Sequence, residues 1–357
     1  MIIHTNKDKM KFKTSLIITA VLLFIMSGNL LNGQNYDLRP VVTLNIGSRI
    51  GQLRAVPVKI GDKHPYAVAF LYSEEAEVDP WEGMFFFPKH TLKLAVMTTS
   101  GELLWRRDLG EGVVPGIWFS PLFAFDLDED GVDELWIINN RDPEHPLNYH
   151  QYVLQKIDPE TGKKLSEIPW PKPEVPQELS HLYRHFILGA YVNGNPLLLT
   201  AQGTYGPMRI QAWNKDMSMR REHIIPKNTP GALGSHVTPV GQPVSLGFDI
   251  YTTIPVDING DGIHELVKGY FEGNGDLIDS KGKILGNIGG LSAMACKFTP
   301  AQGEQILSYS KDGWIKIWAD VNAKDNQKAL NRYANPFYKR NRIQTGNGYN
   351  LFTLGGI

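Results

Sequence analysis

The sequence predicts an all-β fold, a β-propeller of four-stranded antiparallel blades. A ten-residue stretch at residues 126–135, "DLDEDGVDEL", recurs as "DINGDGIHEL" at residues 257–266. Each copy is the polar turn of a hairpin pattern, with β-branched and aromatic runs on both sides. Similar hairpins recur along the chain in pairs. Because two hairpins give four antiparallel strands, their repetition predicts propeller blades.

Five units carry this pattern. The opening hairpins read "RAVPVKIGDKHPYAVAFLY", "LFAFDLDEDGVDELWIIN", "FILGAYVNGNPLLLTAQ", "TTIPVDINGDGIHELVKGY" and "SAMACKFTPAQGEQILSYS". Second hairpins follow as "LKLAVMTTSGELLWRRDL", "YVLQKIDPETGKKLSEI", "MRIQAWNKDMSMRREHI" and "DLIDSKGKILGNIGG", and the fifth unit offers "GWIKIWADV". Residues 38–52 and the tail after Asp320 leave room for further blades, up to seven or eight. A β-sandwich also has many short strands, but five paired hairpins favour the propeller.

The bulk composition is that of a folded globular protein. The chain has 357 residues, of which 42% are hydrophobic and 20% charged. A net charge of −1 argues against a nucleic-acid-binding surface. The single cysteine, Cys296, provides neither a disulfide framework nor a lipid-attachment site behind a leader.

The N-terminal segment has the layout of a secretory signal peptide. Met10, Lys11 and Lys13 precede an apolar run over residues 16–26, then small and polar residues. We expect a signal peptide over residues 1–33 and a single propeller domain over residues 34–357; a retained anchor is the alternative. With no second long apolar run, we expect no membrane span after signal cleavage. We also expect a monomer, located in the periplasm or the extracellular medium.

The two strong turns have the pattern of a calcium loop. Oxygen ligands at positions 1, 3 and 5, with Gly131 or Gly262 at position 6, suit a hard cation such as Ca²⁺. The predicted metal ligands are Asp126, Asp128, Asp130 and Glu134 in the first loop, and Asp257, Asn259, Asp261 and Glu265 in the second. The closing Glu stands at position 9 rather than 12, so these are not EF-hands, and we expect structural ions. The alternative is an Asx-rich turn without metal.

The longer loops carry the unusual residues. In a four-stranded blade, the turns between first and second strands lie on one face, and the second-to-third connections and inter-blade links lie on the other. These longer loops are rich in His, Tyr, Trp and Arg, which suit sugar rings, carboxylates and proton transfer. The candidate substrate-binding residues are Trp81, His90, His185, His236, Tyr251 and Tyr270. For any single loop histidine, a solvated surface position is the alternative, and only convergence favours a site.

Three segments resemble the β-propeller polysaccharide lyases of the rhamnogalacturonan lyase type. They are "LKLAVMTTSGELLWRRDLG … LFAFDLDEDGVDELWI", "AQGTYGPMRIQAWNKD" and "NRYANPFYKRNR". That family pairs an "A-R-G-x-Y" stretch with D-x-D-G-D-G turns and cleaves acidic pectic backbones by β-elimination. Gln202 replaces the expected arginine of that stretch, and Phe248 lies where a polar groove residue is expected. Related propeller lyases such as ulvan lyases, which use His, Tyr and Arg, are an equally near resemblance.

Two functions from different classes follow. The first is a secreted lyase that cleaves an acidic, uronate- or rhamnose-containing polysaccharide. β-Elimination needs a neutralised carboxylate, a base for the C5 proton and an acid for the leaving oxygen. The candidate catalytic residues are Tyr205, His145 and His150 for proton transfer, and Arg209 and Arg184 for the carboxylate. The second function is a calcium-stabilised propeller that binds carbohydrate or protein without chemistry.

Overall fold

The computed structural model describes residues 36–64, 66–76, 87–116, 119–146, 148–171, 184–203, 207–226, 247–248, 253–269 and 273–345. Every strand named below belongs to one compact unit, residues 37–357. The expected signal peptide over residues 1–33 lies outside the described residues.

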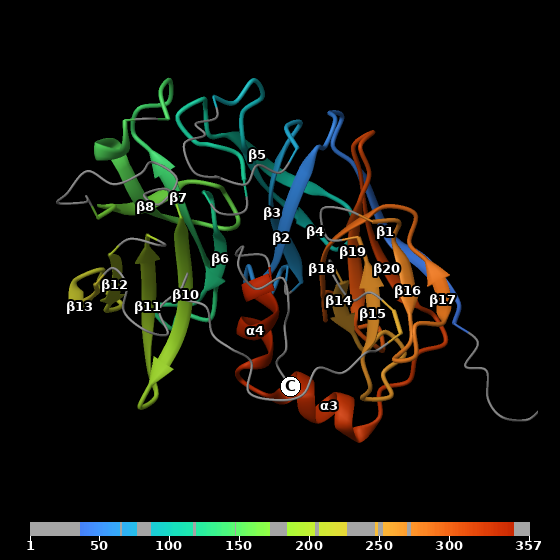
Figure 1. Ribbon diagram of the computed structural model, residues 1–357. Helices are drawn as coiled ribbons and strands as arrows, with labels where there is room; N and C mark the ends of the chain where they lie inside the picture. The colour runs from blue at the N-terminus through green and yellow to red at the C-terminus, as the bar shows by residue number, and fades with distance from the viewer. Residues whose placement is uncertain are drawn as a thin grey trace, which may run out of the picture. The chain divides into compact units, whose positions relative to one another are not determined.

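Five four-stranded antiparallel sheets make up the described fold (Figure 1). Blade 1 consists of β2 (Gln52–Val58), β3 (Ala67–Ser73), β4 (Lys93–Thr98) and β5 (Leu103–Asp108). Blade 2 consists of β6 (Leu122–Phe125), β7 (Glu134–Asn140), β8 (Tyr152–Ile157) and β9 (Lys164–Pro169), with the short helix η1 (Tyr149–Gln151) before β8. Blade 3 consists of β10 (His185–Val192), β11 (Asn195–Gln202), β12 (Met208–Trp213) and β13 (Met219–Ile225). Blade 4 consists of β14 (Thr253–Val256), β15 (Glu265–Lys268), β16 (Asp276–Ile278) and β17 (Ile284–Asn287).

Blade 5 joins the two ends of the domain. Its strands β18 (Leu291–Cys296), β19 (Gln305–Tyr309) and β20 (Trp314–Asp320) are completed by β1 (Leu38–Asn45) as the outermost strand. The register pairs Leu38 with Asp320 and Asn45 with Trp314. The sequence analysis left room for a further blade in residues 38–52. In the structure, the strand that begins at residue 38 instead completes blade 5. The prediction of four-stranded propeller blades is confirmed.

Burial follows the position of each strand within its blade. All seven residues of β3 and of β7 are buried, because neighbouring sheets cover both faces of a middle strand. Outermost strands are more exposed, and β13 has only exposed and half-buried residues. Trp136, Phe70 and Phe123 are the large aromatic side chains at the centre of this core. The near-continuous apolar sequence of the middle strands is thus a consequence of two-sided packing.

The strand connections lie on two opposite faces. The turn face carries the turns between first and second strands, including residues 126–133 and 257–264. The connection face carries the second-to-third connections and the inter-blade links. The innermost strands meet their neighbours: β2 contacts β6 and β18, β10 contacts β6, and β14 contacts β18. This separation of the two calcium-type turns from the longer loops agrees with the sequence prediction.

The segment after Asp320, which left room for a further blade in the sequence analysis, forms helices instead. These are α3 (Gln327–Ala334) and α4 (Tyr338–Thr345), and the side chain of Asn326 caps α3 by accepting a hydrogen bond from the Ala329 N–H. Helix α4 contacts β2, β6, β10 and β18, so it lies against the innermost strands at the turn face (Figure 1). No helix in the described ranges is long and apolar enough to cross a membrane.

Candidate functional site

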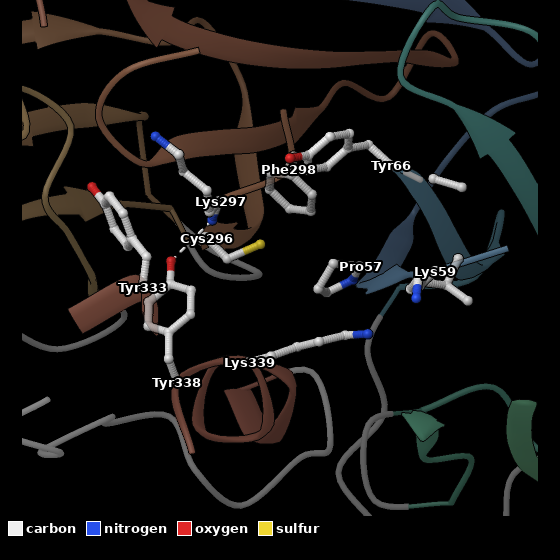
Figure 2. Close-up of a pocket in the computed structure, with 11 residues that line it drawn as sticks. Pro57, Lys59, Tyr66, Cys296, Lys297, Phe298, Tyr333, Tyr338 and Lys339 are labelled. Carbon is white, nitrogen blue, oxygen red and sulfur yellow. Dashed lines mark hydrogen bonds between the residues drawn. The ribbon is translucent and has the colours of Figure 1, made fainter. Parts of the chain in front are cut away.

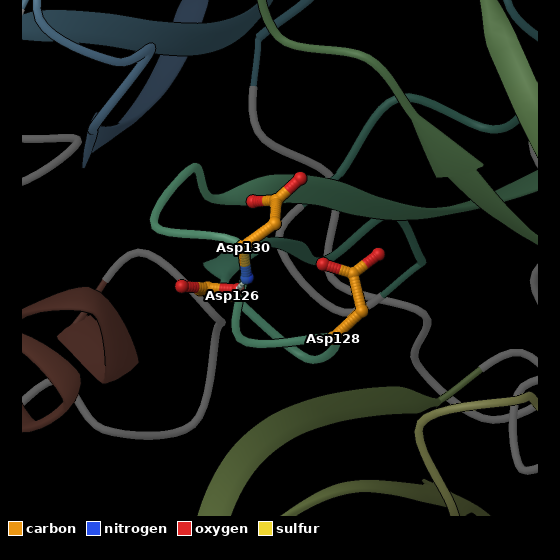
Figure 3. Close-up of side chains that lie close together, drawn as sticks. All are labelled: Asp126, Asp128 and Asp130. Carbon is orange, nitrogen blue, oxygen red and sulfur yellow. Dashed lines mark hydrogen bonds between the residues drawn. The ribbon is translucent and has the colours of Figure 1, made fainter.

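The first calcium-type loop brings three carboxylates together. One oxygen from each of Asp126, Asp128 and Asp130 lies within 4.8 Å of the others (Figure 3). The backbone shapes this cluster, since the N–H groups of Asp130 and Gly131 donate to the Asp126 carboxylate at 3.1 and 2.9 Å. Gly131 has a φ of +91°, which a residue with a side chain rarely adopts. These three residues form a donor set of the kind that fits a divalent cation.

The remaining acid of this loop, Glu134, has another role. Its carboxylate accepts from the Leu127 N–H at 3.0 Å and pairs with Lys156 at 2.8 Å. Burial raises the pKa of Glu134 to about 7, although the hydrogen bond from Lys156 acts in the opposite direction. Lys156 also reaches Asp128 at 2.7 Å. An ion bound by the aspartates would therefore share Asp128 with a lysine, and Glu134 would hold the loop from outside the cluster.

The second loop already contains a cationic side chain. Arg332 of α3 donates to the Asp257 carboxylate at 2.5 Å and to the Gly262 carbonyl at 2.8 Å. Asp257 is fully buried; burial raises its pKa to about 6, and the Arg332 charge opposes that rise. Asn259 donates to Asp261 at 3.1 Å, so part of the ligand set is bonded internally. In the similar turn that predicted a second calcium site, a guanidinium group is thus bound to the first carboxylate.

The helices extend this charged network beneath the inner strands. Arg342 of α4, 2% exposed in its side chain, pairs with the fully buried Glu304 at 2.9 Å and donates to the Pro255 carbonyl at 2.9 Å. Arg342 also donates to the Nε2 atom of His264 at 2.8 Å. Burial and the nearby Arg342 charge both disfavour the protonated imidazole, and together they lower the pKa of His264 to about 4. Lys339 pairs with Asp133 of blade 2.

A cavity of about 280 Å³ opens between blades 1 and 5 and these helices (Figure 2). Two of the three lysines that line it form ion pairs within the protein: Lys297 with Asp325 at 2.9 Å, and Lys339 with Asp133. Burial raises the pKa of the Cys296 thiol well above its ordinary value, so the thiolate that would act as a nucleophile is disfavoured. The cavity therefore offers no activated nucleophile.

On the connection face, the inner strands hold two cationic side chains and an imidazole. Arg54 of β2 is 1% exposed and its Nη1 donates to the Gly116 carbonyl at 2.6 Å. His185, the first residue of β10, is 2% exposed, with Nδ1 at 2.8 Å from the Phe119 carbonyl. Phe119 donates its N–H to Gly116 at 3.1 Å, so both side chains bond one turn. Arg184 precedes His185 and is also buried.

The hydrogen bond to Phe119 fixes the chemical form of His185. A carbonyl oxygen can only accept, so Nδ1 carries a proton, and in the neutral ring Nε2 is the basic nitrogen. Two rings flank the imidazole: Trp170 at 5.1 Å and Tyr152 at 5.9 Å between centroids. The arrangement provides a proton acceptor close to guanidinium groups, which is the combination that proton abstraction next to a carboxylate needs.

The predicted connection-face residues are distributed over several blades. His145 is exposed and packs edge-on against Phe87 at 5.6 Å between ring centroids, and the ring of His150 lies 4.2 Å from that of Tyr149. His90 lies 4.0 Å from Glu74.

Arg209 of β12 forms an ion pair with Glu222 of β13 at 2.6 Å. Its charge is therefore already balanced within blade 3. Five of the predicted residues, Tyr205, Trp81, His236, Tyr251 and Tyr270, lie outside the described residues and stay predictions.

The sequence analysis missed Arg54 and Arg332. A signal for Arg54 was present, because "GQLRAVPV" places Gln52 and Arg54 two residues apart in an otherwise apolar strand. Polar residues at alternate positions of an inner strand share one face, so they indicate a polar lining there. Arg332 carried no comparable signal, since its partner Asp257 lies 75 residues away in the sequence.

Comparisons with known proteins find likeness only at the level of structure. No protein-family model matches the sequence, and no curated protein does. The exotype rhamnogalacturonan lyase YesX is 18% identical with a TM-score of 0.45, over 79% of this chain and 51% of that chain. The rhamnogalacturonan lyase YesW is 16% identical with a TM-score of 0.43, over 81% and 54%. The Bacillus licheniformis rhamnogalacturonan lyase PL11 is 16% identical with a TM-score of 0.43, over 78% of this chain and 51% of that chain.

The chain thus spans about half the length of the rhamnogalacturonan lyases it matches. The resemblance to this type of lyase, stated from sequence segments, is confirmed as a structural similarity. At these identities and TM-scores it concerns the fold and assigns no activity.

Proposed function

We propose that the protein is an exported polysaccharide lyase that cleaves an acidic, uronate-containing polysaccharide by β-elimination on its connection face. The observation that supports this is that Arg54 and His185, from two innermost strands, bond the carbonyls of Gly116 and Phe119, which the Phe119 N–H links to each other. Guanidinium groups neutralise a uronate carboxylate and make the C5 proton more acidic. A neutral imidazole is the side chain that takes such a proton as a general base.

Each group has a distinct role in this proposal. Arg54 and Arg184 attract the carboxylate, and His185 is the base. Tyr205 from the sequence prediction, and His145 or His150 at the rim, are the candidate acids for the leaving oxygen. Arg209 has a supporting role only, because Glu222 already neutralises it.

Calcium is proposed as a structural ion of the first loop. Asp126, Asp128 and Asp130 would hold it, and the ion would stiffen the turn without taking part in the chemistry. In the second loop, Arg332 supplies the positive charge instead.

The experiment is to incubate the protein with rhamnogalacturonan and with ulvan and to record the ultraviolet absorbance of the unsaturated uronate. His185→Gln keeps a hydrogen-bonding side chain but removes the titrating ring, so absorbance should rise at least 100-fold more slowly, on the order expected for a general base. His223→Gln, at an exposed position of the outermost strand β13, is the matched control for loss of a histidine. Equal rates for the two variants would exclude His185 as the base.

The second candidate function is a binding propeller without chemistry. It is favoured by the contacts of the predicted residues, since His145 and His150 pack against aromatic rings and Arg209 is paired. Retention of the protein on an immobilised acidic polysaccharide, together with no cleavage by wild type, would establish this function and reject the lyase.

A further inference from the structure

A groove of about 440 Å³ lies between blades 1 and 2, on the outer strands of both. Arg107 lines it from β5, while Gln155 and Glu167 line it from β8 and β9, where they are directly opposite each other. Arg141 and Pro143, on the connection between β7 and β8, form its end at the connection face. The volume falls in the range of small-molecule sites. These residues are separate from Arg54 and His185 on the inner strands.

The wall of the groove is rigid, because two loops approach closely there. The Gly112 N–H donates to the Pro143 carbonyl at 2.8 Å, and a Cβ added at Gly112 would lie 1.9 Å from the Asp142 oxygen. Asn140 ties the same loops together, since its side chain donates to the Gly112 carbonyl at 2.9 Å and to the His145 carbonyl at 3.2 Å. The groove is thus formed by the fold before any ligand binds.

Several donors surround one carboxylate in this groove. Glu167 accepts from Arg141 Nε at 2.9 Å, from Lys164 at 3.0 Å and from Gln155 Nε2 at 3.1 Å. Burial would raise the pKa of Glu167, but these hydrogen bonds hold it below its ordinary value. Arg141 uses only Nε in this contact; within the described part of the chain its two Nη groups have no other acceptor.

Among the cations that line the groove, Arg141 and Lys164 pair with Glu167, whereas Arg107 forms no ion pair with a described residue. Its Nη2 donates at 3.1 Å to Gln155 Oε1, a neutral acceptor that also receives the Asn139 amide at 3.0 Å. Burial lowers the pKa of Arg107, and the charge of Glu167 opposes that effect. A half-buried guanidinium held by a neutral amide gains more from an incoming anion than an exposed one does.

The charges of the groove favour a ligand with one negative charge. Arg107, Arg141 and Lys164 outnumber Glu167, and the Asp108 carboxylate at the rim is bonded to Thr91 at 2.8 Å and lies 3.7 Å from Lys93. The two carboxylates, Glu167 and Asp108, repel an anion that carries two charges. A planar carboxylate also matches the planar guanidinium groups, which can bind it with paired hydrogen bonds.

We propose that this groove is a binding site for a uronate sugar, with the sugar carboxylate between Arg107 and Arg141. The sugar hydroxyls reach the exposed Lys164 and Asp108, and Pro143 provides an apolar edge for the ring. The choice of a uronate over other carboxylates rests on the proposed function. The site would hold a stretch of acidic polymer away from the inner strands.

The test is isothermal titration calorimetry of the full chain with galacturonate and with glucuronate. These monosaccharides cannot undergo chain cleavage, so failure of the lyase proposal would leave the result unchanged. Galacturonate methyl ester lacks the charge, acetate lacks the hydroxyls, and sulfate carries two charges. We expect at least one uronate to bind more tightly than all three probes.

Variants locate the site. Arg107→Gln and Arg141→Gln should each weaken uronate binding at least tenfold, about 1.4 kcal/mol. Arg106→Gln is the matched control, because Arg106 neighbours Arg107 on β5 but bonds the Ile46 carbonyl and the Tyr72 hydroxyl. Arg141 is exposed, so its variant remains informative if Arg107→Gln does not fold. No uronate binding, equal binding of the ester or acetate, or an equal loss in Arg106→Gln would overturn the proposal.

Discussion

Replacing Arg332 by methionine should convert the second turn from a guanidinium-bound turn into a calcium-dependent one. The substitution keeps a long apolar chain but removes the charge that faces Asp257. The side chains of Arg332 and Asp257 are 6% and 0% exposed, so water cannot replace the lost partner. Breaking a buried ion pair by removing one member costs about 3–5 kcal/mol. We therefore expect the free energy of unfolding, measured by urea denaturation after metal removal, to fall by about that amount.

Added Ca²⁺ should restore much of this loss. In the variant, Asp257, Asn259 and Asp261 keep their oxygen atoms at the positions where a calcium loop places its ligands, without a competing guanidinium group. An ion that binds only the folded state stabilises it by about 2.7 kcal/mol at a hundredfold excess over its Kd. The double variant Asp257→Asn, Arg332→Met removes both charges, so without calcium it should be more stable than Arg332→Met. Its calcium response should be no larger than that of wild type.

The matched control is Lys328→Met, which removes one charge from the exposed side of the same helix. It should leave stability within about 0.5 kcal/mol of wild type, as surface substitutions usually do. If Arg332→Met is as stable as Lys328→Met, the buried pair does not contribute as the geometry implies. If calcium stabilises wild type and Arg332→Met equally, the second loop is not the place where the ion acts.

Three further predictions follow from the described contacts. The pKa of His264 is lowered to about 4, below the unfolded value of 6.5. The stability that depends on its neutral form is therefore fully present above pH 6.5 and is lost as the pH falls toward 4. The loss is at most about 3 kcal/mol, and His264→Gln should flatten this part of the plot of stability against pH. Ca²⁺ should raise the melting temperature of metal-stripped protein through the first loop, and Asp128→Asn should reduce that rise; a melting temperature unaffected by calcium would make the loop a plain turn. Gly112→Ala should destabilise the protein by about 1–3 kcal/mol in urea denaturation, because its Cβ would lie 1.9 Å from the Asp142 oxygen; an unchanged midpoint would mean that the loop moves freely.

The blades could be predicted from sequence because their determinants are local. Each hairpin carries its own turn residues and its own β-branched runs, so "DLIDSKGKILGNIGG" indicates β16 and β17 without reference to the rest of the chain. The assignment of loops to two faces then follows from strand alternation alone. The identity of the strand that completes blade 5 was less accessible, because β1 pairs with β20 across most of the sequence.

The helices and the ion pairs depend on partners that are distant in sequence. Helix α4 reads "YKRNRIQT", with four charged or amide side chains in a row, and it gives no apolar stripe. Its place is determined by Arg342, which reaches Glu304 and the Pro255 carbonyl, and by Lys339, which reaches Asp133. A short segment with this composition is helical only when tertiary contacts support it.

The same distance limits the prediction of the site. The first turn brings Asp126, Asp128 and Asp130 together, because these predicted ligands are alternate residues of one loop. Whether a second copy binds an ion or an arginine depends on a helix 75 residues further on. Likewise, Arg54 and His185 meet only because β2 and β10 both flank the link that contains Gly116 and Phe119.

The opposite placement of the two candidate sites makes their functions separable. His185 lies on the connection face at the start of β10, and Asp128 lies in the turn between β6 and β7 on the turn face. If β-elimination uses the His185 base, His185→Gln should lower turnover roughly 10²-fold or more while calcium still shifts the melting temperature. Asp128→Ala should do the reverse, with a reduced calcium response and nearly unchanged turnover per folded molecule. Activity assays corrected for the folded fraction by circular dichroism distinguish the two patterns. Loss of turnover in folded Asp128→Ala, with His185→Gln still active, would place the chemistry at the metal cluster and reject the site proposed on the inner strands.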